Sequence, residues 1–245
     1  MLSSCCVTPM LPDQVCFPQF GAGSMKQHGF AREMDWAVRY SSADPYPDER
    51  VPTVGLQISS DQRTYSEWSS DFTATIEISL LPEQLQVRLA VRNDSESGSE
   101  MSFTAGLHTY IEVVSTEQDD VGVTGLKGCT YTDKADNFAH KTEDRDFITF
   151  SDGTTTDSIY NTGETSSVQL QVGTGAGIEV YNQEGWTDHV VWSPSTDVPN
   201  NTKFVCLESA AASSPVSVPA QREWVGTMRM SVFDVIGEEG DAGKA

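Results

Sequence analysis

Alternation of apolar and polar residues dominates this chain from residue 54 onward. The clearest run covers residues 72–80, and a second run follows at residues 85–91. Successive side chains of a β-strand point to opposite faces, so each run has one apolar face and one polar face. The short loop between the runs predicts a hairpin of two long antiparallel strands. Because an apolar sheet face must be covered by another layer, the pattern predicts a layered β-protein.

Further segments of the chain have strand character. They cover residues 36–40, 53–59, 102–114, 122–126, 146–150, 167–172, 177–181, 189–192, 203–207 and 223–234. Turn residues at 93–95, 173–175, 199–201 and 213–215 separate them. No apolar period of 3.6 residues extends beyond two turns. These features predict an all-β fold, either a large antiparallel sandwich or a barrel.

No linker rich in Gly, Ser or Pro divides the chain into parts of comparable order. We therefore expect a single domain over residues 1–245, with a core at about 15–235. Residues 41–52 are predicted to form a surface loop and residues 236–245 a loose acidic tail.

The charge balance excludes several classes of partner. Fifteen Lys and Arg stand against 36 Asp and Glu, for a formal charge of -21. Such a field repels nucleic acid and anionic membrane surfaces. No stretch approaches the ~20 consecutive apolar residues of a membrane-spanning helix. We expect a soluble protein that binds a small molecule, with neither nucleic acid nor a membrane as partner.

The cysteines indicate neither a metal site nor a disulfide framework. They are odd in number and irregularly spaced, at Cys5, Cys6, Cys16, Cys129 and Cys206. Structural metal sites use paired ligands, and secreted scaffolds use an even set of cysteines. Residues 1–10 also lack the basic and apolar regions of a signal peptide. This pattern predicts a reduced, cytoplasmic protein without a bound metal.

Two short segments near the amino terminus carry a family resemblance. Residues 15–21 read VCFPQFG and residues 27–32 read QHGFAR, with Trp36 shortly after. Together they resemble the hexose-6-phosphate mutarotase (glucose-6-phosphate 1-epimerase) family of the aldose 1-epimerase-like superfamily. Blocks at residues 103–110, 125–134, 190–194 and 204–208 resemble later family motifs in the same order.

The resemblance spans residues 15 to about 235 and implies a fold and an activity. The implied fold is the galactose mutarotase-like supersandwich. The implied activity is interconversion of the α and β anomers of hexose 6-phosphates by a monomer without a cofactor. Because the substrate is an anion, its phosphate pocket must be a local basic patch within a strongly acidic chain.

Anomer interconversion needs one group that accepts the proton of the C1 hydroxyl and one that protonates the ring oxygen. The family match makes Glu208 the candidate base and His108 the candidate acid, with His28 as a second imidazole at the sugar. Strand alternation also turns Glu208 away from Leu207, onto the more apolar face of Cys206. The alternative is a hydrogen-bonded core histidine at His108 and a surface carboxylate at Glu208.

The same resemblance suggests residues that bind the substrate. Arg32 offers a planar set of donors suited to phosphate, and Lys26 offers a nearby charge. Gln27 precedes His28 in the QHGFAR segment. The aromatic residues Phe17, Phe20 and Trp36 either wall the pocket or belong to the core.

Other polar residues are assigned less specifically. Asp157 matches an Asp-Arg-x-Tyr element that holds sugar hydroxyls, but Ser158 replaces its arginine, so a simple loop residue is an equal alternative. His140 and His189 are expected at the surface or in loops. Asp133 and Lys134 are expected to form a surface ion pair with each other.

The chain departs from the family pattern at its amino terminus. Family members have a longer stretch before the CFPQFG segment, ending in an Arg-Gly-Gly-Ile-Pro approach to it. Here residues 10–14 read MLPDQ, without an arginine. We expect the opening strands of the sandwich to be missing, unless the natural protein is longer. This leaves two functions open: a mutarotase, and a catalytically silent sugar-binding or sugar-phosphate-binding paralog.

Overall fold

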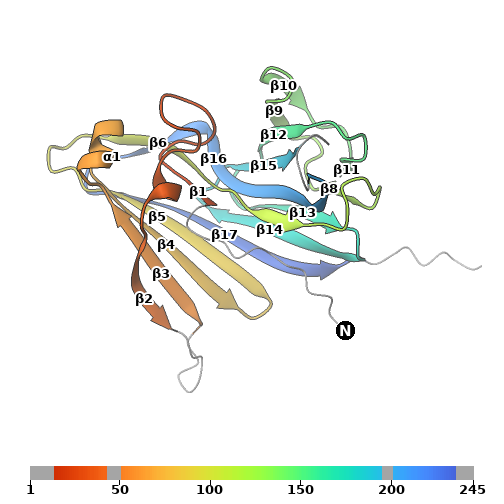
Figure 1. Ribbon diagram of the computed structural model, residues 1–245, viewed down its shortest axis with the longest axis horizontal. Coiled ribbons are helices and arrows are strands. Elements are labelled where there is room, and N and C mark those ends of the chain that lie inside the picture. Colours follow the sequence, from red (N-terminus) through yellow and green to blue (C-terminus); the bar gives the residue numbers. More distant parts are fainter. Residues whose placement is uncertain (1–13, 43–50, 195–200, 236–245) are drawn as a thin grey trace, which may run out of the picture.

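The computed structural model describes residues 14–42, 51–194 and 201–235. Most of these residues lie in two antiparallel β-sheets stacked on each other (Figure 1). The predictions for Cys5, Cys6, residues 1–10 and the tail at 236–245 lie outside the described residues, as do residues 43–50 of the predicted loop and residues 199–200 of the predicted turn. The first two residues of that loop, 41 and 42, are in a strand instead. Within the described part, no helix is long and apolar enough to cross a membrane.

The first sheet has eight strands. Their spatial order is β1 (Val15–Cys16), β6 (Met101–Leu107), β16 (Phe204–Val218), β15 (Asp188–Ser193), β12 (Thr156–Asn161), β9 (Thr130–Asp133) and β10 (Ala139–Thr142), and β7 (Tyr110–Glu112) also pairs with β16. The long strand β16 lies near the middle of this sheet. It pairs with β15 along one side and with β6 and β7 along the other.

The second sheet has nine strands. Their order is β11 (Ile148–Thr149), β8 (Val121–Thr124), β13 (Ser166–Val172), β14 (Ala176–Glu184), β17 (Glu223–Asp234), β5 (Gln84–Asn93), β4 (Phe72–Leu81), β3 (Thr53–Ser59) and β2 (Ala37–Ser42). The predicted hairpin is formed by β4 and β5, which pair from Phe72 with Asn93 to Leu81 with Gln84. One α-helix, α1 (Gln62–Glu67), and the 3-10 turns η2 (Ala31–Glu33) and η3 (Asn201–Lys203) complete the described elements. The predicted all-β antiparallel fold is confirmed.

Alternation along the strands divides their side chains between two environments. Val205 and Leu207 of β16 belong to the hydrophobic core between the sheets, together with Val91 of β5 and Val180 of β14. Neighbours at i and i+2 share a face, so Glu208 faces away from that core. The same alternation in β15 places Val191 in the core, while the residues on either side of it point to the opposite face of the sheet. A second set of buried side chains thus lies on the outer face of the eight-stranded sheet.

Several local predictions are wrong. The predicted strand at residues 102–114 is broken at His108 and Thr109, where the amide of Thr109 donates to the carbonyl of Leu107 (2.9 Å). The predicted turn at residues 213–215 is part of β16, which continues with a register shift between Ala211 and Val216. Strands β9, β10 and β12 were not predicted, because their short sequences show no clear alternation.

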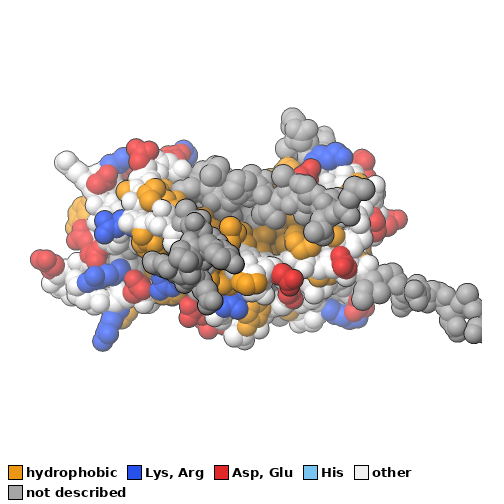
Figure 2. Space-filling model, turned by 90° about the horizontal axis from the view of Figure 1, so that it is seen from below, with side chains coloured by type: hydrophobic (Ala, Val, Ile, Leu, Met, Phe, Trp, Pro, Cys, Tyr) orange, Lys and Arg blue, Asp and Glu red, His pale blue; other side chains and the backbone are white. Residues whose placement is uncertain are grey.

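Seen from below, the molecule shows hydrophobic side chains in the middle of one face, with acidic and basic side chains around them (Figure 2). Large side chains at the surface include Val38 on β2, Leu80 on β4 and Val232 on β17. All three belong to strands of the nine-stranded sheet. The polar cluster described next lies on the other sheet.

Candidate active site

The segment from Phe17 to Phe30 connects β1 to η2, and the core fixes its beginning. The ring of Phe17 is fully buried, with its centroid 5.2 Å from that of Phe72 and 5.2 Å from that of Phe103. The amide group of Gln19 then organises the loop: its Nε2 donates to the carbonyl of Gly21 (3.0 Å), and its Oε1 accepts from the amide of Met25 (3.1 Å). The loop therefore has a defined conformation.

His28 lies at the end of this loop in the left-handed backbone region, with φ of 68°. Its Nδ1 accepts a hydrogen bond from the amide of Gly21 (3.3 Å) and lies 3.1 Å from Cys16 Sγ. Burial, together with the charges of Arg32 and Lys134, lowers the pKa of His28 to about 4. The imidazole is thus neutral near pH 7, with Nδ1 as an acceptor.

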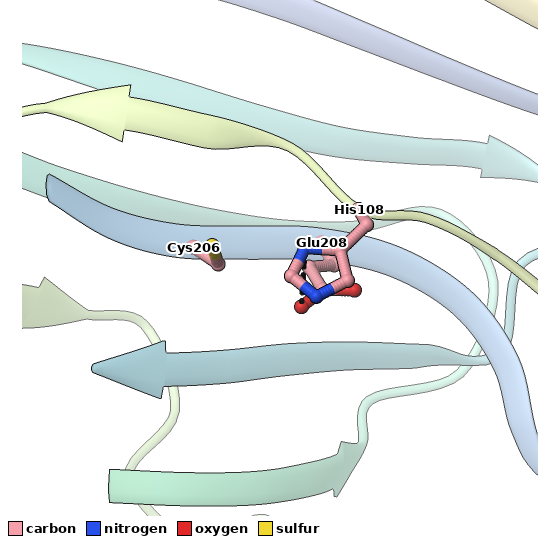
Figure 3. A group of neighbouring side chains, drawn as sticks. All are labelled: His108, Cys206 and Glu208. Atoms are coloured by element: carbon pink, nitrogen blue, oxygen red, sulfur yellow. Dashed lines mark ion pairs between the residues drawn. The ribbon is translucent and has the colours of Figure 1, made fainter. Parts of the chain in front are cut away.

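Glu208 and His108 come together on the outer face of the eight-stranded sheet (Figure 3). Glu208 lies within β16, and His108 lies at the break between β6 and β7. His108 Nδ1 is 3.5 Å from Glu208 Oε1, and the two residues are 9% and 1% exposed. His108 Nδ1 and Glu208 Oε2 are buried without a hydrogen-bond partner among the described residues. Buried polar atoms are nearly always paired, so these two atoms are candidates for contact with a ligand.

Burial shifts the pKa values of this pair in opposite directions. It raises the pKa of Glu208 well above its ordinary value of 4.5. It lowers the pKa of His108 to about 3, and the neighbouring His28, Arg32 and Lys134 act in the same direction. Desolvation penalises the charged form of each group. The pair therefore favours a protonated carboxyl beside a neutral imidazole.

An aromatic wall surrounds His108. The ring of Tyr110 stacks on the imidazole at 4.8 Å and 9°, and the ring of Trp192 meets it edge-on at 5.9 Å. The imidazole of His28 lies on another side, at 5.3 Å. The orientation of His108 is thus set by packing from β7, β15 and the loop before η2.

Asp157 is a strand residue of β12, and Lys134 follows β9 directly. Lys134 Nζ donates to both carboxylate oxygens of Asp157, at 2.8 and 2.7 Å. The predicted pair between Asp133 and Lys134 is wrong, because Asp133 binds Lys141 instead (2.8 Å). The sequence analysis did not assign Lys134 to the site, although Lys134 belongs to the motif block at residues 125–134. Strand β12, which brings Asp157 beside Lys134, was not predicted.

The basic candidates have unequal surroundings. Arg32 Nη2 donates to Cys16 Sγ (3.3 Å), and its buried Nε has no partner in the part of the chain that the structure describes. Lys26 is exposed and forms an ion pair with Glu33. Gln27 is also exposed, with its Nε2 3.3 Å from His28 Nε2. Of the two basic residues, Arg32 is the one with a buried donor available to a ligand.

Every residue that the sequence predicted for the site lines one cavity of about 480 Å³: Lys26, Gln27, His28, Arg32, His108, Asp157 and Glu208. This volume suits a small molecule. Phe20 also lines the cavity, whereas Phe17 belongs to the core. Trp36 is absent from the lining and donates its Nε1 proton to the carbonyl of Ala31 (3.0 Å).

The remaining histidines have different positions. His140 is exposed on β10, as predicted. His189 is fully buried, so its predicted surface position is wrong. Its Nδ1 lies 2.9 Å from Thr162 Oγ1, and its Nε2 lies 3.3 Å from the carbonyl of Val180 in the facing sheet. Burial lowers the pKa of His189 to about 4, which makes it a neutral, hydrogen-bonded core residue.

Comparison with known proteins places the chain in a family. The family model described as "Aldose 1-epimerase" matches residues 12–231. A protein of Cenchrus ciliaris described as "Putative glucose-6-phosphate 1-epimerase" is 28% identical over 232 residues, which cover 89% of this chain and 68% of that protein. A protein of Escherichia coli with the same description is 28% identical, and the match covers 85% of this chain and 69% of that protein.

Solved structures show the same fold. A "putative mutarotase" from Salmonella typhimurium superposes with a TM-score of 0.74 at 22% identity, covering 90% of this chain and 73% of that one. A "galactose mutarotase related enzyme" from Lactobacillus acidophilus superposes with a TM-score of 0.73 at 16% identity, covering 91% and 83%. The expected galactose mutarotase-like sandwich is confirmed, and with the match to the family model over most of its length, the chain belongs to the aldose 1-epimerase family.

Proposed function

We propose that this protein interconverts the α and β anomers of hexose 6-phosphates. The observation that carries the proposal is the pair of Glu208 and His108, buried side by side with unpartnered atoms in one cavity. A carboxyl and an imidazole are the proton acceptor and donor that ring opening requires. The printed descriptions of the relatives from Cenchrus ciliaris and Escherichia coli support the same substrate class.

The pair needs one proton to perform the reaction. In the free cavity, burial favours this proton on Glu208. Its transfer to His108 across the 3.5 Å contact creates a carboxylate base and an imidazolium acid. Glu208 then takes the proton of the C1 hydroxyl while His108 protonates the ring oxygen, and the ring opens to the aldehyde. Rotation about C1–C2 and closure by the reverse transfers give the other anomer.

A phosphate group on the substrate would assist this proton transfer. The positive charges of Arg32 and Lys134 contribute to the low pKa of His108. A phosphate dianion bound between them would offset these charges and favour the imidazolium form. Arg32 is the proposed phosphate ligand, because its buried Nε lacks a partner. Lys26 and Gln27 would contact the substrate at the exposed rim, and Asp157, oriented by Lys134, would accept sugar hydroxyls.

The decisive experiment follows the equilibration of pure α-glucose 6-phosphate by polarimetry or NMR. We expect the wild-type protein to accelerate it and Glu208→Gln to lower kcat by about 10²- to 10⁴-fold. Glu112→Gln, an exposed carboxylate on β7 outside the cavity, is the matched control and should keep the wild-type rate. An undiminished rate in Glu208→Gln would sink the mechanism.

A second assay separates phosphorylated from free sugars. Arg32→Gln should lower kcat/KM for glucose 6-phosphate by about 10- to 100-fold, since hydrogen bonds to charged groups contribute about 1.5–3 kcal/mol. The rate with glucose should change little. An equal loss with both sugars would show that Arg32 does not distinguish the phosphate.

A catalytically silent sugar-phosphate-binding protein is the second candidate function. It is favoured by Asp157, each of whose carboxylate oxygens already accepts a hydrogen bond from Lys134 and so has less capacity left for sugar hydroxyls. Calorimetric binding of glucose 6-phosphate without any acceleration of anomer exchange would support it. The cytoplasmic location and the monomeric state remain predictions.

A further inference from the structure

Cys206 extends the buried pair into a group of three potential metal ligands. One donor atom each from His108, Cys206 and Glu208 lies within 4.8 Å of the others (Figure 3). Cys206 and Glu208 are two residues apart on β16 and share a face, while His108 comes from the neighbouring strand break. The sequence shows no paired ligand motif, because His108 lies about a hundred positions before the other two donors and meets them only through the pairing of β16 with β6 and β7.

The three residues are buried and include donor atoms that are available to a metal ion. Cys206 is fully buried with a free thiol, and Glu208 is 1% exposed. Within residues 14–42, 51–194 and 201–235, His108 Nδ1 and Glu208 Oε2 have no hydrogen-bond partner. Two unpaired buried atoms of ligating type therefore lie beside a third donor. The adjoining cavity of about 480 Å³, which His108 and Glu208 line, offers a path for an ion and room for a further ligand.

The donor set selects the class of ion. Imidazole nitrogen, thiolate sulfur and carboxylate oxygen are the ligands of tetrahedral Zn²⁺, at about 2.0–2.3 Å from the metal. Donors at these distances lie about 3.5 Å apart in a tetrahedron. His108 Nδ1 and Glu208 Oε1 already have this separation, and the spread of 4.8 Å closes with side-chain movements of about 1 Å. Three protein ligands leave the fourth position open.

The charges around the group are mixed. A thiolate and a carboxylate together offset the two charges of the ion. Arg32 and Lys134 lie close enough to oppose a cation, but Lys134 is bound by Asp157. Arg32 donates to Cys16 Sγ, and the chain as a whole has a formal charge of -21. The charges around the group therefore permit a cation to bind.

We propose that Zn²⁺ or a related thiol-binding divalent cation binds to His108, Cys206 and Glu208 and blocks the cavity. On binding, the ion displaces the proton of the Cys206 thiol and any proton on Glu208, and both protons pass to solvent. The blocked state occupies the two proposed proton-transfer groups, so the inhibitory effect, unlike the binding itself, rests on the proposed function.

Binding is tested with the metal alone. Titration of the full chain with Zn²⁺ should give one tight site and a higher Tm, because the ion binds the folded state. Co²⁺ at the same site should give the near-ultraviolet absorption of a cobalt–thiolate bond. Cys206→Ser should abolish that absorption and weaken Zn²⁺ binding about 100-fold or more. Cys129→Ser, which alters a thiol outside the group, is the matched control and should bind as the wild type does.

Cys206→Ala serves as a second variant in case the serine is poorly tolerated in its buried position. Zinc affinity in both variants equal to that of the wild type would overturn the proposal, as would loss of the cobalt–thiolate absorption in Cys129→Ser. In the rate assay, Zn²⁺ should inhibit the wild type, and a chelator should restore its rate. Cys206→Ser should keep the wild-type rate without zinc and should not be inhibited by it. Thiol-dependent metal binding in a protein without any turnover would preserve the site and reject the proposed function.

Discussion

His28 brings its imidazole to the cavity from an unusual backbone conformation. A non-glycine residue at φ of 68° is uncommon, and such strain concentrates at functional sites. Asn adopts this region more readily than most residues, while a β-branched residue adopts it least readily. Substitutions at this position can therefore distinguish the loss of the imidazole from strain in the backbone.

We predict that His28→Asn keeps the free energy of unfolding within about 0.5 kcal/mol of wild type. Turnover of glucose 6-phosphate should fall about 10-fold or more, because the imidazole beside His108 is lost. His28→Val should lower turnover too and should, in addition, destabilise the protein by about 1–3 kcal/mol. Urea unfolding and the anomer assay measure the two effects. Wild-type turnover in His28→Asn would exclude a role for this imidazole.

The raised pKa of Glu208 also has a consequence for stability. Burial raises its folded-state pKa above the ordinary value of 4.5. Such a group contributes stability that is fully present below about pH 4.5 and is lost as the pH rises through the folded-state pKa. At alkaline pH the wild type therefore carries a buried carboxylate that a neutral amide would avoid.

We predict that Glu208→Gln is more stable than wild type at pH 8, by about 1 kcal/mol or more. The difference should shrink as the pH falls toward 4.5, where both side chains are neutral. Thermal or urea unfolding of both proteins at several pH values measures it, and other carboxylates cancel in the comparison. A difference that grows toward acid pH would contradict a raised pKa.

At the scale of strands, alternation was sufficient to predict β4, β5 and β17. It also predicted that Glu208 shares a face with Cys206, which is confirmed, because β16 has regular parity over these residues. Motif resemblance added the residues that come from loops and strand ends. Together, alternation and motif resemblance predicted a set of polar residues that all line the same cavity.

The errors arise where pairing between distant segments decides the structure. Strand β12 has a weak pattern but lies between β15 and β9, and this position brings Asp157 beside Lys134. His189 is buried because its polar partners come from Thr162 and from β14 of the facing sheet. No local sequence pattern reveals partners supplied by another sheet.

The glycine of β6 at position 106 makes room for an aromatic residue of the cavity. A Cβ atom there would lie 2.6 Å from the ring of Phe20 and 3.4 Å from the Cβ of Ala210. Phe20 lines the cavity, and its ring meets His28 edge-on at 5.4 Å. A change on the strand should therefore be transmitted to the site through Phe20.

We predict that Gly106→Ala lowers turnover about 10-fold while it destabilises the protein by only about 1–3 kcal/mol. Phe20→Leu in the same chain should restore part of the activity, because the smaller side chain vacates the space. A double-mutant cycle with both single variants measures the coupling. Additive effects would show that Phe20 does not transmit the change.

The two sheets form a scaffold whose charge opposes its proposed substrate. A formal charge of -21 would repel the proposed sugar phosphate, whereas Arg32 and Lys134, which line the cavity, would attract it there. These influences differ in range. The Debye length falls from about 30 Å at 0.01 M salt to about 8 Å at 0.15 M, and partly buried charges are screened less than surface charges. Salt therefore removes the repulsion first.

We predict that raising the ionic strength from about 0.01 to about 0.15 M increases kcat/KM for glucose 6-phosphate by a few-fold. The value for unphosphorylated glucose should not change, because a neutral sugar does not respond to the field. Initial rates of anomer exchange with both sugars, in a salt whose anion does not compete for phosphate sites, measure the difference. A decrease for glucose 6-phosphate would mean that the local attraction of Arg32 and Lys134 outweighs the field of the whole molecule.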